Sequence, residues 1–490
     1  MTAFQMTMPL LILVGGATAI LLFGASGSKS GARPLPPALT LLTCAAALIA
    51  LFALRPETPV RGLDGFVFWD PLGVAGAALA VFATGVLGLL AGDYLKKADA
   101  NHAEFYALAL FAAAGMVVMT LTDHLVSVFL GLEVMSLSLY VLCAMLRGRA
   151  TSTEAGIKYF LAGSFASAIF IMGLALLFGA TGRLDLPGVA SRLSDGAGPG
   201  QAGAVLLLGA FAFKLALAPF HQWTPDVYEG APTPVTGYMS VAVKAAAFTA
   251  FFRLVRAAGP DAALHGALAW LAALTMLVGN LGALAQTSVK RMLAYSSIGH
   301  AGYLLLAPIA DAPGSSQAAE AMTTYLTAYA LTNLLAFGAL SFLETREGAG
   351  LTFEELRGAR WRRPLHAVAL CVAMLSLAGA PPTAGFLAKF RLFGAVLERG
   401  RATGESVYYL LTAVAVVTSL AALGYYLRVI VTLYFSEPQG SPANLPRFSP
   451  AHRVVLAALA AAVLWLGVGP AVLGVGAEAL FGFARDAAGG

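Results

Sequence analysis

Four lysines of this chain lie within, or at the edge of, long apolar stretches: Lys158, Lys214, Lys244 and Lys389. A carboxylate, Glu133, interrupts another such stretch, which reads FLGLEVMSLSLYVL. An ammonium group that is taken out of water releases its proton more readily, whereas a guanidinium group stays charged in the same place. Because a charge in apolar surroundings is costly, ionisable residues there predict a function. Lysine together with glutamate predicts a path for protons.

The combination of an acid with a lysine indicates how such a path would switch. A carboxylate beside a lysine holds the ammonium form, and moving the carboxylate away lets the proton leave. Lys158 also has a plainer interpretation. It follows Glu154 by four residues and lies near the start of its apolar run, where a long side chain can reach the membrane interface.

His300, in the stretch YSSIGHAGYLL, has two interpretations that the sequence leaves open. Its imidazole titrates near neutral pH, which suits a proton relay. A histidine that packs in the interior with its hydrogen bonds satisfied gives the same pattern. The neighbouring Ser296, Ser297 and Tyr303 could hold water or bond across helices.

The composition places these residues in a membrane protein. Of the 490 residues, 59% are hydrophobic and only 11% are charged, and the mean hydropathy is +0.79. Soluble globular domains are far more polar. The net charge of +5 does not indicate a nucleic-acid partner, because the arginines lie between apolar runs and form no continuous basic patch.

Motifs for cofactor or metal chemistry are missing from the sequence. Cys44, Cys143 and Cys371 stand singly in separate apolar runs, so their spacing suits neither a metal ion nor an iron-sulfur cluster. The glycine-rich stretches at 23–31 and 467–476 match neither a phosphate-binding loop nor the dinucleotide fingerprint. We therefore expect no NADH, flavin or metal centre in this chain.

Apolar runs of about 20 residues, the length that crosses a bilayer, recur along the whole chain. They predict an all-α polytopic membrane protein with about fourteen transmembrane helices. The runs lie at 8–25, 37–54, 71–92, 105–122, 125–146, 156–180, 202–220, 234–252, 266–287, 292–309, 322–343, 365–388, 407–433 and 454–480. The first run lacks the basic start and the cleavage site of a signal peptide, so we expect it to remain as a span. The polar stretches 183–201 and 344–364 are predicted to be loops.

Lysine and arginine in the connections favour one orientation. The connections after odd-numbered spans carry Lys29, Arg33, Lys96, Lys97, Arg147, Arg149, Lys290, Arg291, Arg346, Arg357, Arg360, Arg362, Arg363, Arg447 and Arg453. The connections after even-numbered spans carry fewer, among them Arg55, Arg61, Arg183, Arg192, Arg253, Arg256, Arg399 and Arg401. Because positive charge accumulates on the cytoplasmic side, this count places both termini outside the cytoplasm.

Proline interrupts two of the runs, five spans apart. The seventh run has Pro219 after Lys214, and the twelfth has Pro381 and Pro382 before Lys389. A broken helix survives at membrane depth only where protein or water surrounds its backbone. Because five is odd, spans 4–8 and 9–13 would form two inverted repeats, which is typical of transporters. The predicted plan is a single membrane domain, 1–490, with a three-helix segment at 1–100, repeats at 104–256 and 262–434, and a last helix at 450–490.

One segment closely resembles a known family. Residues 219–235 read PFHQWTPDVYEGAPTPV, which resembles the signature of the N-subunit family (NuoN-type) of respiratory complex I, the proton-pumping NADH:quinone oxidoreductase. Further stretches are similar to the same family: GLEVMSLSLYVL at 131–142, EAGIKYFLAGSFASA from Glu154, VKRMLAYSSIGHAGYLL from Val289 and LAGAPPTAGFLAKF from Leu377. The likeness runs from about span four to span thirteen. Subunits of Mrp-type cation/proton antiporters are the alternative, but they typically have FH-x-W-L-P-D-A where this chain has FHQWTPDVYEG.

The resemblance implies a proton-translocating, antiporter-like subunit without a redox site of its own. It implies that Glu133 on span five pairs with Lys214 on span seven, that Lys244 is the central lysine and that Lys389 is the terminal one. Lys158 also matches a lysine of this family. Flavin, iron-sulfur clusters and quinone are expected in partner subunits of the complex, whose membrane arm includes antiporter-like M-type and small K-type subunits. The expected location is the bacterial inner membrane.

Overall fold

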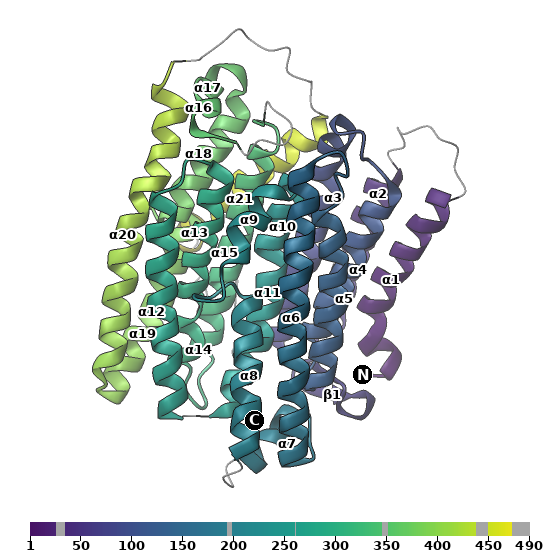
Figure 1. Ribbon diagram of the computed structural model, residues 1–490, viewed down its shortest axis with the longest axis vertical. Helices are drawn as coiled ribbons and strands as arrows, with labels where there is room; N and C mark the ends of the chain where they lie inside the picture. The colour runs from purple at the N-terminus through teal and green to yellow at the C-terminus, as the bar shows by residue number, and fades with distance from the viewer. Residues whose placement is uncertain (26–34, 194–197, 260, 345–350, 438–448, 473–490) are drawn as a thin grey trace.

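Long helices run side by side along the long axis of the molecule in this computed structural model (Figure 1). The structure describes residues 1–25, 35–193, 198–259, 261–344, 351–437 and 449–472. Within these ranges, eleven helices are long and apolar enough to cross a membrane. The chain is therefore a mostly helical, multi-pass membrane protein.

The first half of the chain contains most of the short elements. Its elements are α1 (Ala3–Ala25), α2 (Leu35–Ala53), β1 (Val60–Gly62), η1 (Leu63–Gly65), β2 (Val67–Trp69), α3 (Pro71–Lys97), α4 (Ala103–Thr120), α5 (Leu125–Cys143), α6 (Ala150–Thr181), α7 (Leu186–Leu193), α8 (Gly198–Lys214), α9 (Trp223–Gly230), α10 (Thr233–Tyr238), the π-helical turn η2 (Met239–Val243) and α11 (Lys244–Ala258). Strands β1 and β2 form an antiparallel hairpin at one end of the bundle.

In the second half, the elements within the part that the structure describes are all helices, joined by turns. Its helices are α12 (Ala262–Leu284), α13 (Val289–Leu304), α14 (Leu306–Ala310), α15 (Gln317–Leu340), α16 (Phe353–Leu356), α17 (Ala359–Arg362), α18 (Pro364–Ala378), α19 (Ala384–Thr403), α20 (Ser406–Phe435) and α21 (Pro450–Val472). Figure 1 shows α1 and α20 at opposite edges of the bundle.

The predicted loops at 183–201 and 344–364 are wrong in part, because both contain short helices. Helix α7 lies in the first stretch, and α16 and α17 lie in the second. Local hydrogen bonds explain the start of each. The Asp185 carboxylate accepts from the backbone N–H of Gly188 at 2.9 Å, and Thr352 and Glu355 form a reciprocal capping box at the start of α16.

The central helices are buried on all sides, whereas the peripheral ones are not. Nearly all residues of the span formed by α10, η2 and α11, and of the span formed by α13 and α14, lie inside the bundle. Only a minority of the residues of α6, α20 and α21 are buried, and their outer faces carry large exposed apolar side chains such as Phe165, Leu420 and Val454. Exposed apolar faces of this kind are suited to lipid or to other membrane subunits.

The two halves make the same backbone contact at corresponding places. His124, just before α5, forms an antiparallel bridge with Asp185, and Ser288, just before α13, forms one with Thr352. The helix pairs that follow also pack alike. A Cβ atom at Gly115 would lie 2.5 Å from the carbonyl oxygen of Gly131, and one at Gly279 would lie 2.9 Å from that of Tyr295. Ser288, Gly279 and Tyr295 each follow their counterparts by 164 positions.

Candidate functional site

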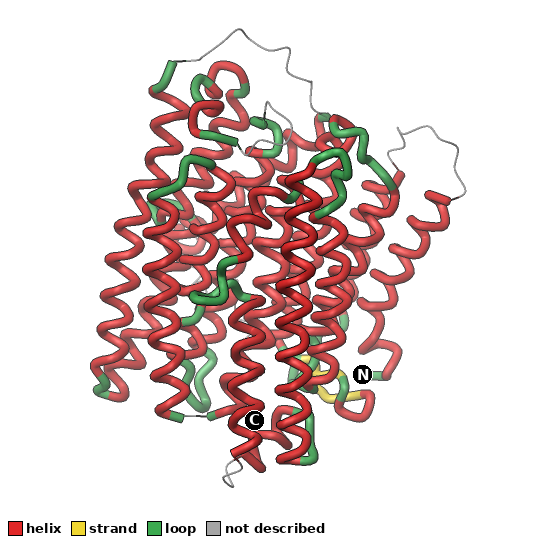
Figure 2. Tube along the Cα trace, in the orientation of Figure 1, coloured by secondary structure: helices red, strands yellow, loops and turns green. Residues whose placement is uncertain are grey.

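The first helix break lies directly after Lys214, not at Pro219. Helix α8 ends at Lys214, and the backbone N–H groups of Ala216 and Leu217 close the helix by donating to the carbonyls of Phe213 and Ala212 at 3.0 and 2.8 Å. This is a Schellman ending, for which Ala216 takes the left-handed conformation with φ of 58°. Figure 2 shows the non-helical segment between α8 and α9 about midway along the bundle.

Lys214 is buried and is held by neutral groups. Its ammonium Nζ donates to Ser136 Oγ at 2.8 Å and to Tyr159 OH at 3.1 Å, and it lies 5.1 Å from the centre of the Tyr159 ring. Tyr159 in turn stacks on Trp223 of α9, with ring centres 4.6 Å apart. The ammonium group is therefore held by two hydroxyl oxygens and an aromatic ring, and none of these groups carries a charge. Lys214 can lose its proton and become a neutral amine without leaving an unpaired anion beside it.

Glu133 and Lys214 are not in hydrogen-bond or ion-pair contact with each other. Glu133 is partly buried, and its carboxylate accepts a short hydrogen bond from Ser167 Oγ of α6. Ser136, three residues further along α5, bonds Lys214 instead. Residues three apart are neighbours on a helix. Glu133 therefore lies one turn along α5 from Ser136, the residue that bonds Lys214.

Lys158 lies on the outer side of α6. Its Nζ pairs with Glu154 at 2.7 Å and with Asp226 of α9 at 2.8 Å, and 44% of its side chain is exposed. Asp226 also pairs with Arg291 at 2.7 Å. This is the geometry of the interfacial lysine that the sequence left open as an alternative, with two acids beside it.

Lys244 follows directly on the π-helical turn η2, Met239–Val243. Such turns interrupt the regular hydrogen bonds of a helix and are frequent at functional sites. The buried ammonium donates a short hydrogen bond to the carbonyl oxygen of Ser297 and lies 5.4 Å from the centre of the Tyr329 ring. Tyr329 OH donates to Ser297 Oγ at 2.9 Å, so one serine on α13 contacts both groups.

His300 has hydrogen-bond partners on both ring nitrogens. Nδ1 lies 2.6 Å from Tyr325 OH, and Nε2 lies 3.2 Å from Tyr426 OH. Tyr426 OH also lies 2.5 Å from Ser296 Oγ. The histidine is thus buried with both hydrogen-bonding positions occupied. It also links the hydroxyl of Tyr325 to those of Tyr426 and Ser296. Both interpretations that the sequence offered are compatible with this geometry.

The second helix break closes like the first. Helix α18 ends at Ala378, and Gly379 takes the left-handed conformation with φ of 83°. The N–H groups of Gly379 and Ala380 donate to the carbonyls of Ser376 and Leu375 at 2.9 and 3.0 Å, which is again a Schellman ending. The equivalent residues of the two endings, Ala216 and Gly379, are 163 positions apart, one fewer than the 164 positions that relate the glycine contacts.

Lys389 reaches back across this break from α19. Its Nζ donates to the carbonyls of Leu377 and Ala378 at 2.9 and 3.1 Å and to Ser419 Oγ at 2.8 Å. These carbonyls belong to the end of α18 and have no partner inside that helix, so an ammonium group suits them in both hydrogen bonding and charge. The group also lies 5.5 Å from the centre of the Tyr303 ring.

These contacts form a polar axis through the middle of the bundle. Lys214, Lys244 and Lys389 are all buried, each lies against a tyrosine ring, and hydroxyl groups and His300 of α13 lie between the last two. A hydroxyl both donates and accepts a hydrogen bond, so such a row can pass protons without a net charge on its intermediate members.

Two further buried charge pairs involve residues that the charge count had assigned to connections. Lys290 lies inside the first turn of α13 and pairs with Glu344 at 3.6 Å. Arg253 lies inside α11, contacts Asp70 and donates to the carbonyl of Thr122 at 2.8 Å. Hydropathy alone did not reveal them, because a charge near a helix end looks like part of the adjoining loop.

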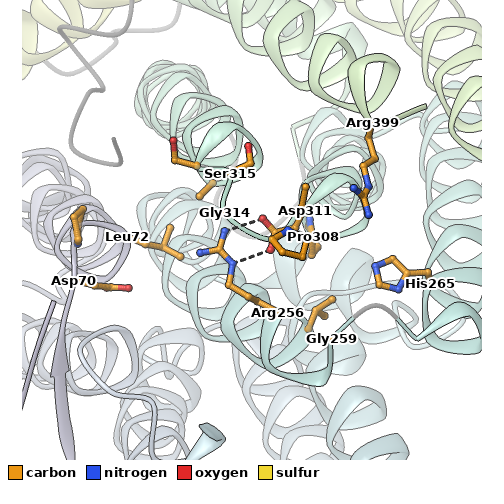
Figure 3. Close-up of a pocket in the computed structure, with 16 residues that line it drawn as sticks. Asp70, Leu72, Arg256, Gly259, His265, Pro308, Asp311, Gly314, Ser315 and Arg399 are labelled. Carbon is orange, nitrogen blue, oxygen red and sulfur yellow. Dashed lines mark hydrogen bonds and ion pairs between the residues drawn. The ribbon is translucent and has the colours of Figure 1, made fainter. Parts of the chain in front are cut away.

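A cavity of about 300 Å³ lies at the end of the bundle opposite Lys290. Figure 3 shows its lining, where the guanidinium group of Arg256 bonds the Asp311 carboxylate through Nε and Nη2, at 2.7 Å each. His265 and Arg399 also line it. Its charged walls suit water more than an apolar ligand.

Comparisons with known proteins agree on one family. Residues 122–419 match the family described as NADH:quinone oxidoreductase/Mrp antiporter, transmembrane. NADH-quinone oxidoreductase subunit N of Myxococcus xanthus is 39% identical to this chain over 95% of both chains, and subunit N of Chloroflexus aggregans is 40% identical over 94% of both. This chain belongs to the N-subunit family of NADH-quinone oxidoreductase.

Solved structures have the same fold as this member of the N-subunit family. A chain of respiratory complex I from Thermus thermophilus superposes with a TM-score of 0.79 at 36% identity, covering 98% of this chain and 100% of that one. A chain of the Mrp complex from Dietzia superposes with a TM-score of 0.84 at 22% identity, covering 99% of this chain and 97% of that one. The second similarity concerns the fold alone.

Proposed function

We propose that this N-subunit-family chain is a proton-translocating, antiporter-like membrane subunit of an NADH:quinone oxidoreductase. The observation that carries the proposal is the row of buried lysines, Lys214, Lys244 and Lys389, each held by neutral acceptors, with hydroxyl groups and His300 between the last two. Quinone reduction takes place in partner subunits, which hold the flavin, the iron-sulfur clusters and the quinone. This chain supplies titratable groups and a polar path, and so acts as the translocase part of the enzyme.

The mechanism starts at Glu133. An electrostatic change in a neighbouring subunit moves the carboxylate toward or away from Lys214, between the Ser167 contact and a direct ion pair. When the carboxylate lies away, the ammonium form of Lys214 loses its stabilisation and the proton moves to Lys244. From there it passes along the hydroxyl groups and His300 to Lys389 and leaves the membrane. Lys158 adjusts the charge around Asp226 at the outer side of this path.

We also propose the number of membrane crossings, the repeat structure and the orientation of the chain. Adding α8, α15 and the α18–α19 pair to the eleven candidate spans gives fourteen crossings. The matched bridges, the matched glycine contacts and the two Schellman endings support inverted repeats at 104–256 and 262–434, between an N-terminal segment at 1–100 and a last helix at 450–490. We place the chain in the bacterial inner membrane with both termini outside the cytoplasm, next to M-type and K-type subunits.

The alternative is a subunit of an Mrp-type cation/proton antiporter, and the fold shared with the Dietzia Mrp complex chain supports it. The two candidates differ in what drives the protons. An antiporter subunit would exchange sodium for protons without an electron donor, so rescue of a sodium-sensitive, antiporter-deficient strain by this chain would favour it.

The substitution Lys244→Ala tests the proposal. In inverted membrane vesicles that contain the whole complex, it is expected to lower the number of protons pumped per NADH oxidised, because the central proton carrier is removed. Lys96→Ala is the matched control, because Lys96 lies exposed at the end of α3. An unchanged proton yield in the Lys244→Ala complex, at normal assembly, would show that the path does not run through this lysine.

A further inference from the structure

Lys290 and Glu344 form a buried charge pair that the path described above does not use. Their side chains are 4% and 12% exposed, and Nζ lies 3.6 Å from Oε1. Nζ also donates to the carbonyl of Ala231 at 2.9 Å. On the other side of the pair, Thr233 Oγ1 and Tyr94 OH donate to the carboxylate at 2.5 and 3.3 Å. Glu344 therefore joins four helices at one end of the bundle: α3, α10, α13 and α15.

The pair lies close to the aqueous side of the membrane. Lys97 is exposed, and its Nζ donates to the backbone carbonyl of Glu344 at 3.2 Å. Arg149 donates to Tyr94 OH at 3.2 Å. The described charged groups near the pair are therefore two cations at its outer side, Lys97 and Arg149, and one acid, Glu229 on α9. A carboxylate in this position can exchange protons with water at its outer edge while its inner edge faces the bundle.

A row of buried polar side chains leads from Glu344 to Lys244 along one span. Thr233, Thr236, Ser240 and Lys244 follow at spacings of three, four and four residues, and all four are buried. These spacings place them on one face of a helix. The row extends over about 16 Å, since eleven residues of helix rise 1.5 Å each.

The two neighbouring helices, α13 with Lys290 and α15 with Glu344 just after its end, also contribute polar groups near Lys244. On α13, Ser297 follows Lys290 by seven residues, or two turns, and its carbonyl accepts from Lys244. On α15, Asn333 donates to the carbonyl of Tyr329 at 3.1 Å, and Tyr329 OH donates to Ser297 Oγ. One row of polar side chains, on the span of α10 and α11, thus leads to Lys244 from the Lys290–Glu344 end, and polar groups of α13 and α15 surround its inner end. A purely structural charge pair does not require them.

We propose that Glu344 takes up protons from the aqueous face and delivers them to Lys244, with Lys290 as its positioning partner. This inference rests on the proposed function and adds the uptake site to it. The Glu344 carboxylate binds a proton from water and becomes a neutral acid. The proton then moves along the hydroxyl groups to the neutral amine of Lys244, which becomes an ammonium group, and Glu344 returns to the carboxylate. The positive charge of Lys290 stabilises the carboxylate form of Glu344 and so favours release of the proton.

The substitution Glu344→Gln tests the inference, because it keeps the shape and the hydrogen-bond acceptor of the side chain but removes the exchangeable proton site. In vesicles that hold the whole complex, we expect initial proton uptake per NADH oxidised to fall roughly 100-fold, the low end of what one positioned acid–base group contributes. Glu344→Asp is expected to restore part of the uptake. Glu354→Gln is the matched control, because Glu354 is an exposed acid in α16, at the same end of the bundle.

A double variant separates uptake from structure. Glu344→Gln alone leaves the Lys290 charge buried without its partner and is expected to weaken assembly. Adding Lys290→Met removes that charge, so the double variant should recover assembly but not proton uptake. If the double variant pumps normally, or if Glu344→Gln alone does, the pair is structural and the inference is wrong. The proposed function would be unaffected by that result as long as Lys244→Ala abolishes pumping.

Discussion

Replacing Gly379 with Ala would move the Lys389 ammonium group without changing the lysine itself. A Cβ atom at Gly379 would lie 2.9 Å from Lys389 Cδ and 3.4 Å from its Nζ. Ordinary contacts between carbon atoms lie at about 3.5–4.0 Å, so the lysine side chain has to shift by roughly 0.5–1 Å. A shift of that size draws Nζ away from the carbonyls of Leu377 and Ala378.

The cost to stability has two parts. Gly379 has φ of 83°, and a residue with a Cβ atom in this conformation costs about 1–2 kcal/mol. Weakening hydrogen bonds to a charged donor adds about 1.5–3 kcal/mol for each bond that is lost. The rate of proton transport should fall as well, since a 1 Å misplacement of a reacting group can lower a rate about 100-fold.

Gly404→Ala provides the control. Gly404 has φ of 73° at the end of α19, but no atom lies within 4 Å of a Cβ atom placed there. Both variants therefore carry the backbone strain, and only Gly379→Ala displaces Lys389. We expect both complexes to lose some thermal stability and only Gly379→Ala to lose proton pumping, measured by quenching of a pH-sensitive dye in inverted vesicles at equal NADH oxidation. Equal pumping by the two variants would refute the role given to the position of Lys389.

Three other substitutions probe the remaining contacts. Arg253→Met removes one partner of a buried ion pair and should lower the free energy of unfolding by about 3–5 kcal/mol, seen as earlier thermal dissociation of the purified complex. Tyr325→Phe removes the hydroxyl that bonds His300 Nδ1, and a slower proton release with unchanged assembly is expected if the histidine relays protons. Lys158→Met should reduce pumping less than Lys214→Met does, because Lys158 lies at an exposed, ion-paired edge and not on the buried axis.

Most spans could be predicted from the sequence because hydropathy is a local property, and eleven of the described helical segments have the length and hydropathy of a membrane span. The twelfth predicted run, 365–388, was less accurate, because it covers α18 and only the start of α19, which continues to Thr403. The exact ends depend on capping. Helix α8 stops at Lys214, five residues before Pro219, because the chain closes its hydrogen bonds through Ala216.

The contacts of the site could not be predicted in the same way. Tyr325 and Tyr426, which bond His300, lie on α15 and α20, 25 and 126 residues away in the sequence. Tyrosines in apolar runs are common, so their type alone carries no signal. Ser167 was likewise one serine among many, although it holds the Glu133 carboxylate. Such partners follow from how the helices pack, which no single stretch of sequence encodes.

The tyrosine rings beside the lysines have a practical consequence for measurement. Tyr159, Tyr329 and Tyr303 each present a ring about 5 Å from a different ammonium group, and the field of a cation so close to an aromatic face changes the vibrations of that ring. Each ring is therefore a built-in sensor of the charge on its own lysine. Isotope labelling of one tyrosine at a time, followed by infrared difference spectroscopy during turnover, would record the order in which the three lysines gain and lose their protons.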